Sequence, residues 1–253
     1  MSYKLLYNIN NMKELDITEY SISDRFHLTL AVVADLHGEP FDLIQDAFTS
    51  KPPDIICIPG DLCPFITAGH NENKFRHQNN QAMAFLKYAV TIAPVYYSRG
   101  NNEKDWQITV FSELIRLGVH VLENTWEEIV PGLAIGGLAS GVTPRFRRPS
   151  LPKTEWLLEY ETYNGYKVLL SHHPEYYKPY IQEHDIDLVI SGHAHGGQIR
   201  IKDQGLFAPG QGFFPELTSG LYDHRMLISR GISRKPWFVP SCGNPPELVY
   251  IKL

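Results

Sequence analysis

The stretch LTLAVVADLHGEP, residues 28–40, decides the fold, because an apolar run ends there in Asp35 and His37. A short apolar run bounded by turn residues is consistent with a strand that is buried on both faces. In an open α/β sheet the carboxyl ends of such strands lie along one edge, which is where ligands bind. The stretch therefore predicts an α/β fold with a polar site directly after this strand.

Further apolar segments of strand type also end in polar motifs. They occupy residues 54–59, 93–98, 166–170 and 187–191. The motifs that follow them are Gly60-Asp61, Gly100-Asn101, Ser171-His172 and the run Gly192-His193-Ala194-His195-Gly196-Gly197. Because the strand ends share one edge, we expect residues far apart in the sequence to converge there.

These motifs supply seven candidate metal ligands, namely Asp35, His37, Asp61, Asn101, His172, His193 and His195. Oxygen and imidazole ligands without a thiolate suit first-row divalent metals, of which Mn, Fe or Zn are expected. Asp61 ends a strand near the centre of the expected sheet, so we cast it as a carboxylate shared by two ions. A lone His or Asp at a strand end is more often a cap, but so many motifs in one chain favour a binuclear centre.

Composition sets the broad class of the protein. The chain has 253 residues, a hydrophobic content of 43% and a charged content of 20%, which is typical of a soluble globular protein with one domain spanning residues 1–253. A net charge of −5 argues against broad binding to nucleic acid, which usually needs a basic face. Three cysteines without a CxxC pair favour a reducing compartment, and no signal peptide or membrane span is recognisable. We therefore expect a cytoplasmic protein.

The order of the patterns predicts the architecture. Strands alternate with helices, expected near 41–50, 77–91 and 105–117, which predicts a mostly parallel sheet with right-handed crossovers. From Val119 onward short strands follow without intervening helices, which predicts a second sheet or an antiparallel extension. A further helix is expected at 154–162. The expected fold is an α/β sandwich: two sheets face to face, with helices outside.

The motifs DLH, GD, GNN, SHH and GHAHGGQ resemble, in order, the signature blocks of the calcineurin-like metallophosphoesterases. The resemblance begins at about Lys13 and implies a two-sheet β-sandwich flanked by helices, in four αββα layers. The GHAHGGQ form and the tail MLISRG…NPPELVYIKL are similar to the bacterial branch of membrane-associated phosphodiesterase-like proteins, which includes hydrolases of UDP-diacylglucosamine.

The resemblance also implies a site and a reaction. Asp35, His37, Asp61 and His195 would hold the first metal, and Asp61, Asn101, His172 and His193 the second. A metal-bridging hydroxide would hydrolyse a phosphoester, more often a phosphodiester or pyrophosphate than a simple monoester. The substrate would be a small or lipid-linked phosphoester, with peripheral membrane contact left open.

The sequence departs from the family at the third block. Family members usually have Gly-Asn-His there, whereas this chain has Asn102 in place of the histidine that assists the leaving oxygen. An amide has no titratable proton, so Asn102 can only orient or hydrogen-bond the substrate. His173 is a candidate substitute acid, although the neighbour of a ligand more often points to the opposite face. For His70 and His77, solvated loop histidines are the better interpretation.

Two other groups are candidates for substrate binding. Arg145, Arg147 and Arg148 lie in a Pro-bounded loop and would grip a second anionic group, with a surface charge cluster equally compatible. The aromatic residues between the GHAHGGQ block and the last strand would line an acyl chain or stack a base, but ordinary packing is the favoured interpretation; they are Phe213, Phe214, Tyr222, Trp237 and Phe238.

The sequence therefore predicts a di-metal phosphoesterase. The main alternative is a catalytically weakened metal-binding or scaffold protein that keeps the fold, which only Asn102 supports. A nuclease is disfavoured by the net charge.

Overall fold

Strand β3 (Thr29–Val32) shows why the apolar runs are continuous. Leu30 and Val32 pack into the core between two sheets, whereas Ala31 and Val33 pack into a second core beneath helices. All four side chains are fully buried. A strand covered on both faces leaves no polar face, so its sequence cannot alternate.

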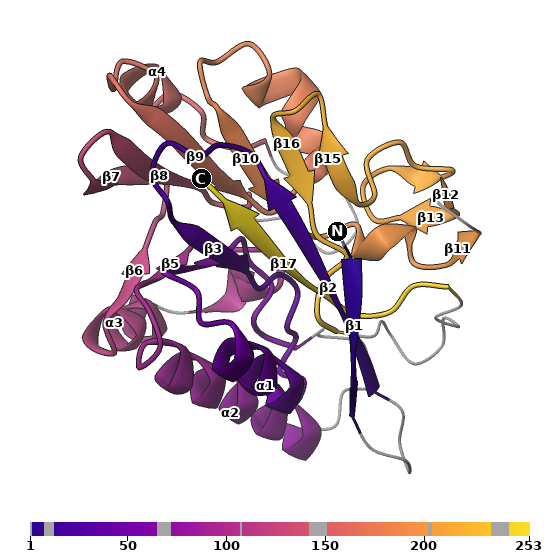
Figure 1. Ribbon diagram of the computed structural model, residues 1–253. Coiled ribbons are helices and arrows are strands. Elements are labelled where there is room, and N and C mark those ends of the chain that lie inside the picture. Colours follow the sequence, from indigo (N-terminus) through magenta and orange to yellow (C-terminus); the bar gives the residue numbers. More distant parts are fainter. Residues whose placement is uncertain are drawn as a thin grey trace.

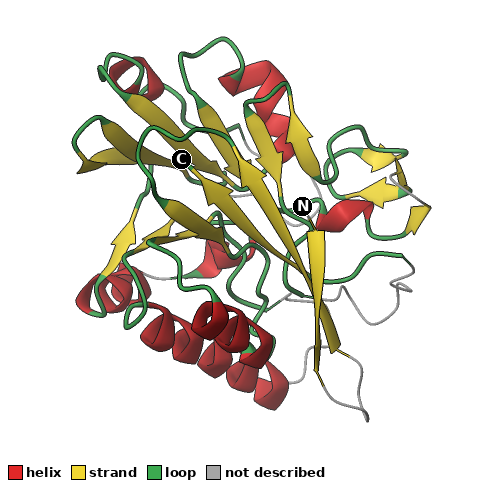
Figure 2. Ribbon diagram, in the orientation of Figure 1, coloured by secondary structure: helices red, strands yellow, loops and turns green. Residues whose placement is uncertain are grey.

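The computed structural model describes residues 2–7, 13–64, 72–106, 108–141, 151–201, 204–233 and 243–253. The two main sheets lie face to face in the centre, and the helices cover their outer faces (Figures 1 and 2). This arrangement confirms the four-layer fold expected from the sequence.

The first sheet has seven strands in the order β1-β2-β17-β3-β4-β5-β6. Strands β3 to β6 run parallel to one another, β17 is antiparallel to β3, and β1 is antiparallel to β2. The strands other than β3 are β1 (Ser2–Tyr7), β2 (Lys13–Ser21), β4 (Ile55–Ile58), β5 (Val95–Tyr97), β6 (Val119–Val121) and β17 (Glu247–Lys252).

The second sheet has six strands in the order β15-β16-β10-β9-β8-β7, and its central strands are parallel. They are β7 (Thr125–Val130), β8 (Leu133–Leu138), β9 (Tyr166–Ser171), β10 (Leu188–Ser191), β15 (Gly220–Tyr222) and β16 (Met226–Ile228). The change of pattern at Val119 thus marks the passage from the first sheet to the second, because β6 is an edge strand of the first sheet and β7 is an edge strand of the second.

The helices cover the two outer faces. Helices α1 (Asp42–Ser50), α2 (Glu72–Ala89) and α3 (Ile108–Arg116) pack on the first sheet through residues such as Phe48, Phe85 and Leu114. The second sheet is covered by α4 (Leu157–Tyr160), the 3-10 turn η2 (Pro174–Tyr176) and the π-helical turn η3 (Tyr177–Ile181). The helix expected at 154–162 is therefore shorter in the structure, where only Leu157–Tyr160 is α-helical. None of the described helices is long and apolar enough to cross a bilayer.

Four short strands lie outside both main sheets. β11 (Arg200–Ile201) pairs with β12 (Gln204–Gly205), and β13 (Phe207–Ala208) pairs with β14 (Gly212–Phe213). They follow the 3-10 turn η4 (His195–Gly197) and project at one side of the sandwich (Figure 1).

Candidate metal centre

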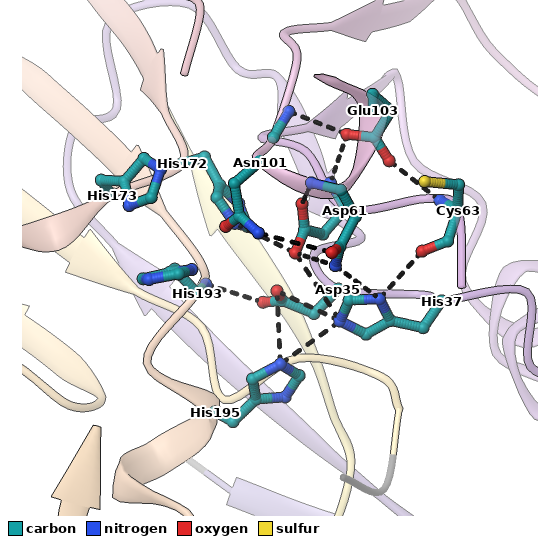
Figure 3. A network of polar contacts seen from close by, with 12 residues as sticks. Asp35, His37, Asp61, Cys63, Asn101, Glu103, His172, His173, His193 and His195 are labelled. Atoms are coloured by element: carbon teal, nitrogen blue, oxygen red, sulfur yellow. Dashed lines mark hydrogen bonds and ion pairs between the residues drawn. The ribbon is translucent and has the colours of Figure 1, made fainter. Parts of the chain in front are cut away.

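Five strands from the two sheets deliver the candidate ligands to one end of the sandwich. Asp35 and His37 follow β3, Asp61 follows β4, and Asn101 follows β5 in the first sheet; His172 follows β9, and His193 and His195 follow β10 in the second. The side chains point toward one another between the ends of the two sheets (Figure 3). The convergence expected from strand order is therefore present in the structure.

Asp35, His37 and His195 form the first group of side chains. Asp35 Oδ1 lies 3.7 Å from His37 Nε2 and 3.6 Å from His195 Nε2. The two imidazoles are stacked, with their Nε2 atoms 3.3 Å apart. All three residues are buried, and one ligand atom from each lies within 4.8 Å of the others, so the group is able to hold one metal ion.

Asp61, His172 and His193 form the second group, with ligand atoms again within 4.8 Å of one another. His172 Nε2 lies 3.3 Å from Asp61 Oδ2 and 3.2 Å from Asn101 Oδ1. The backbone N–H of His193 donates to Asp35 Oδ2 at 2.9 Å, which fixes this group against the first. Asn101 thus lies beside the second group, as expected.

Asp61 belongs to the second group and also lies close to the first. Its Oδ2 atom is 3.3 Å from His172 Nε2 of the second group and 3.8 Å from His37 Nε2 of the first. The spacing Asp-x-His at 35–37 keeps both residues in one group, whereas the same spacing at His193 and His195 spans both groups. Spacing alone did not distinguish these two outcomes.

The chemistry of the donors fits divalent metal ions. Asp35 Oδ1 is buried and has no hydrogen-bond donor within reach among the described residues, while imidazole nitrogens surround it at 3.6–3.7 Å. Two ligand atoms about 2.1 Å from one ion lie roughly 3.0–3.5 Å apart, close to these separations. A buried carboxylate oxygen surrounded by imidazole nitrogens is the arrangement expected of a metal ligand.

Burial and the attraction between neighbouring charges together shift the pKa values of these groups. Burial raises the pKa of Asp35 to about 7, lowers the pKa of His37 to about 4 and lowers that of His193 well below its usual value. Burial opposes ionisation of Asp61 and His172 as well, but their mutual attraction prevails. This attraction lowers the pKa of Asp61 and raises the pKa of His172 to about 9. Near neutral pH the imidazoles of His37 and His193 and the carboxylate of Asp61 are thus in their metal-binding forms, whereas His172 and Asp35 must release a proton when a metal binds.

The backbone of the ligand residues is unusual. Asp35, His37, Asp61, His193 and His195 have φ between +44° and +63°. Few non-glycine residues adopt this left-handed region, although Asp, Asn and His do so more readily than most. Residues held there cluster at functional sites, where the surrounding structure maintains the conformation.

Glu103 holds the loops that carry the ligands, and sequence reasoning did not assign it this role. Its fully buried carboxylate accepts three backbone N–H groups: Asp61 at 3.0 Å, Cys63 at 2.9 Å and Gly100 at 2.9 Å. The loops after β4 and β5 are thereby joined at close range. A Cβ atom on Gly100 would lie 2.2 Å from Asp61 Oδ1, so only glycine fits there. The sequence shows only an acidic residue two positions after the candidate ligand Asn101, which does not by itself reveal this role.

Asn102 lies against Asp61. Its side-chain amide donates to Asp61 Oδ2 at 2.7 Å, and its backbone N–H donates to Asp61 Oδ1 at 2.9 Å. The residue is half-buried and also approaches His37 Nδ1 at 3.3 Å. In this position it orients the shared carboxylate, and its role toward substrate stays a prediction.

His173 lies beside the second group. Its ring centroid is 4.2 Å from that of His193, and its Nδ1 is 3.0 Å from Glu175 Oε1. Glu175 is also 3.8 Å from His193 Nε2, and these three residues form a third cluster of potential ligand atoms. His173 is therefore near the site, and its role as an acid remains a prediction.

Several other candidates are not placed. Arg145, Arg147, Arg148, His70, Trp237 and Phe238 lie outside the described residues, and the side chain of His77 in α2 is likewise not described.

A family match covers the part of the chain that carries the candidate ligands. A family model described as calcineurin-like phosphoesterase matches residues 28–197, a range that contains every ligand motif. Uncharacterized protein YpbG of Bacillus subtilis (strain 168) is 26% identical over 185 residues, which cover 72% of this chain and 65% of YpbG. The match therefore spans just under two thirds of that relative.

Solved structures also match at low identity. The protein TT1561 of Thermus thermophilus has a TM-score of 0.45 and 14% identity, with 65% of this chain and 81% of TT1561 covered. The NAD nucleotidase NadN of Haemophilus influenzae has a TM-score of 0.43 and 15% identity, with 66% of this chain and 38% of NadN covered.

Proposed function

Because this chain belongs to the calcineurin-like phosphoesterase family, we propose that it hydrolyses a phosphoester with two divalent metal ions. The position of Asp61 supports this proposal best. One of its carboxylate oxygens lies 3.8 Å from an imidazole of the first ligand group and 3.3 Å from an imidazole of the second. A shared carboxylate of this kind suits two ions held close together.

The geometry supports the following roles. Asp35, His37 and His195 would hold one ion, Asn101, His172 and His193 would hold the other, and Asp61 would contribute to both. Such ions, when bound, lower the pKa of a water molecule and neutralise charge on phosphoryl oxygens. Mn, Fe or Zn suit these ligands.

The chain's own residues prepare this site. Asn102 donates two hydrogen bonds to the Asp61 carboxylate, one to each oxygen, and so fixes its plane. Glu103 ties the Asp61 loop to the Gly100 loop, which holds Asp61 and Asn101 in register. Preorganised ligands of this kind need little rearrangement when the substrate arrives.

We propose a phosphodiester or a pyrophosphate as the substrate. Asn102 cannot supply a titratable proton to a leaving oxygen. A leaving group that is already stable as an anion, such as a phosphate, needs that proton less than an alkoxide does. Arg145, Arg147 and Arg148 are proposed to bind a second anionic group of the substrate.

The test measures metal content and turnover on the same preparations. The wild type should retain metal and hydrolyse bis-p-nitrophenyl phosphate, and His172→Ala should lose both properties together. A matched control is His184→Ala, since His184 pairs with Glu161 away from the ligand groups. This control should retain full activity.

The rival function is a metal-binding scaffold that keeps the fold, and the Asn102 substitution favours it. Metal retention without turnover of phosphodiesters, pyrophosphates or monoesters by the wild type would support the scaffold and contradict the proposed hydrolysis.

A further inference from the structure

Three phenylalanines lie exposed on the β13–β14 ribbon. Phe213 is 80% exposed, Phe214 is 72% exposed and Phe207 is 38% exposed. The rings of Phe207 and Phe213 contact each other edge to face at 5.5 Å. The ordinary packing favoured from the sequence is therefore wrong for Phe213 and Phe214, because the ribbon projects from the sandwich and nothing described packs over these rings.

The ribbon and its flanks, residues 204–215, carry no charged side chain, although 20% of the whole chain is charged. We call residues 206–214 the aromatic hairpin. An exposed segment with several large apolar side chains and no charge marks an interaction site more often than a solvated surface.

The polar groups of the aromatic hairpin are largely satisfied within the protein. The side chain of Gln211 donates to the Leu217 carbonyl at 2.7 Å and accepts the Leu217 N–H at 3.0 Å. The backbone N–H of Phe214 donates to Leu206 at 2.9 Å, and that of Gln211 donates to Ala208 at 3.2 Å. Moving this hairpin out of water therefore breaks few hydrogen bonds with solvent, and the polar cost is small.

We propose that the aromatic hairpin inserts into the interfacial region of a lipid bilayer. A phenylalanine side chain has roughly 150–250 Å² of surface to bury, so the exposed parts of these three rings amount to about 400 Å². A stable protein interface buries about 800 Å² per partner. The residues that contribute most binding energy in protein interfaces are Trp, Tyr and Arg, which this hairpin lacks. Its size and composition fit a shallow apolar anchor better than a protein-binding surface.

Charge indicates which lipids the hairpin accepts. The chain has a net charge of −5, and the aromatic hairpin contributes no positive charge of its own. Attraction to anionic headgroups needs clustered Lys or Arg, which the aromatic hairpin itself lacks. Binding should therefore occur on zwitterionic vesicles and should change little with salt, because apolar burial is not screened.

The aromatic hairpin lies next to the candidate metal centre. Strand β13 contacts η4, which begins at His195. At the tip, Gly210 approaches Glu175 so closely that a Cβ atom would lie 2.1 Å from Oε1, and Glu175 contacts His173. A bilayer at the hairpin would thus lie beside the metal ligands. If the proposed function holds, the substrate is a phosphoester presented at a lipid surface.

The experiment measures co-sedimentation of the full chain with phosphatidylcholine vesicles at low and high salt. The double variant Phe213→Ser/Phe214→Ser should lower the partition coefficient at least about tenfold. The matched control is Ile108→Ser/Ile115→Ser on α3, whose side chains are 78% and 60% exposed on another element. This control should bind vesicles like the wild type.

Several outcomes would overturn the proposal. Wild-type protein that stays in the supernatant, or equal losses in both double variants, would show that the hairpin is not an anchor. A concentration-dependent dimer that only the phenylalanine variant abolishes would assign the hairpin to a second copy instead. Binding that requires anionic lipid and disappears with salt would assign it to charge elsewhere.

Turnover of bis-p-nitrophenyl phosphate in solution separates this proposal from the proposed function. The phenylalanine variant should keep wild-type turnover of this water-soluble substrate while losing vesicle binding. Vesicle binding without any turnover would retain the anchor and refute the hydrolase.

Discussion

Replacing Glu103 with glutamine should destabilise the protein by about 2–4 kcal/mol. A hydrogen bond to a charged buried group contributes about 1.5–3 kcal/mol, and Glu103 accepts three of them. A glutamine oxygen placed at the Oε2 position would keep the contacts to Asp61 and Gly100 in weaker, neutral form. Its NH₂ group would then face the Cys63 N–H, which leaves two donors opposed. Removing a buried charge offsets part of this loss, because burial raises the pKa of Glu103.

Urea unfolding followed by tryptophan fluorescence measures this change. It should be done with and without chelator, since the three bonds go to backbone groups and act whether or not metal is bound. Glu216→Gln is the control. Glu216 and its partner Lys178 are both exposed, and an exposed ion pair contributes at most about 1 kcal/mol to the free energy of unfolding. A Glu103→Gln protein as stable as this control would refute the reasoning. A loss seen only without chelator would show that Glu103 acts on the metal instead.

Three further outcomes are expected. Asp61→Ala should lose both metal ions while Asn101→Ala mainly weakens one, and full occupancy of Asp61→Ala in elemental analysis would contradict the sharing of Asp61. Asn102→His should accelerate hydrolysis of alkyl more than aryl phosphodiesters, by up to about 10²-fold; a wild-type plot of log kcat/KM against leaving-group pKa that is already flat would argue against this. Tyr160→Phe should cost about 1–2 kcal/mol of unfolding free energy, because its buried hydroxyl lies 2.7 Å from the Val168 carbonyl; thermal unfolding unchanged within error would disprove it.

The strand-end motifs could be predicted within each sheet, because parallel neighbours such as β3 and β4 place Asp35 and Asp61 on one edge. His172 follows β9 of the second sheet, and it meets them because the two sheets pack face to face, which the pattern of any single strand does not show. The division of His193 and His195 between the two groups could not be derived in this way. It depends on backbone angles in a turn of three residues, and the periodicity of the sequence does not predict those angles.

The role of Glu103 and the exposure of Phe213 were not predictable for different reasons. The three contacts of Glu103 are made to backbone N–H groups, which carry no residue-specific signal in the sequence. Phe213 has the large apolar side chain that is typical of a core residue, and only the projection of β13–β14 from the main sheets leaves it in solvent. Side-chain type predicts burial only when the element itself is covered.

The left-handed backbone at Asp35, Asp61 and His195 affects how any substitution there should be interpreted. Alanine at such a position removes the ligand atoms but keeps a Cβ, which disfavours the left-handed conformation that the loop requires. Glycine removes the same side chain but adopts that conformation freely. A pair of variants at one position, Ala against Gly, therefore separates the loss of a ligand from the loss of loop geometry. If a glycine variant is more stable than its alanine counterpart yet equally inactive, the missing ligand atom alone accounts for the inactivity.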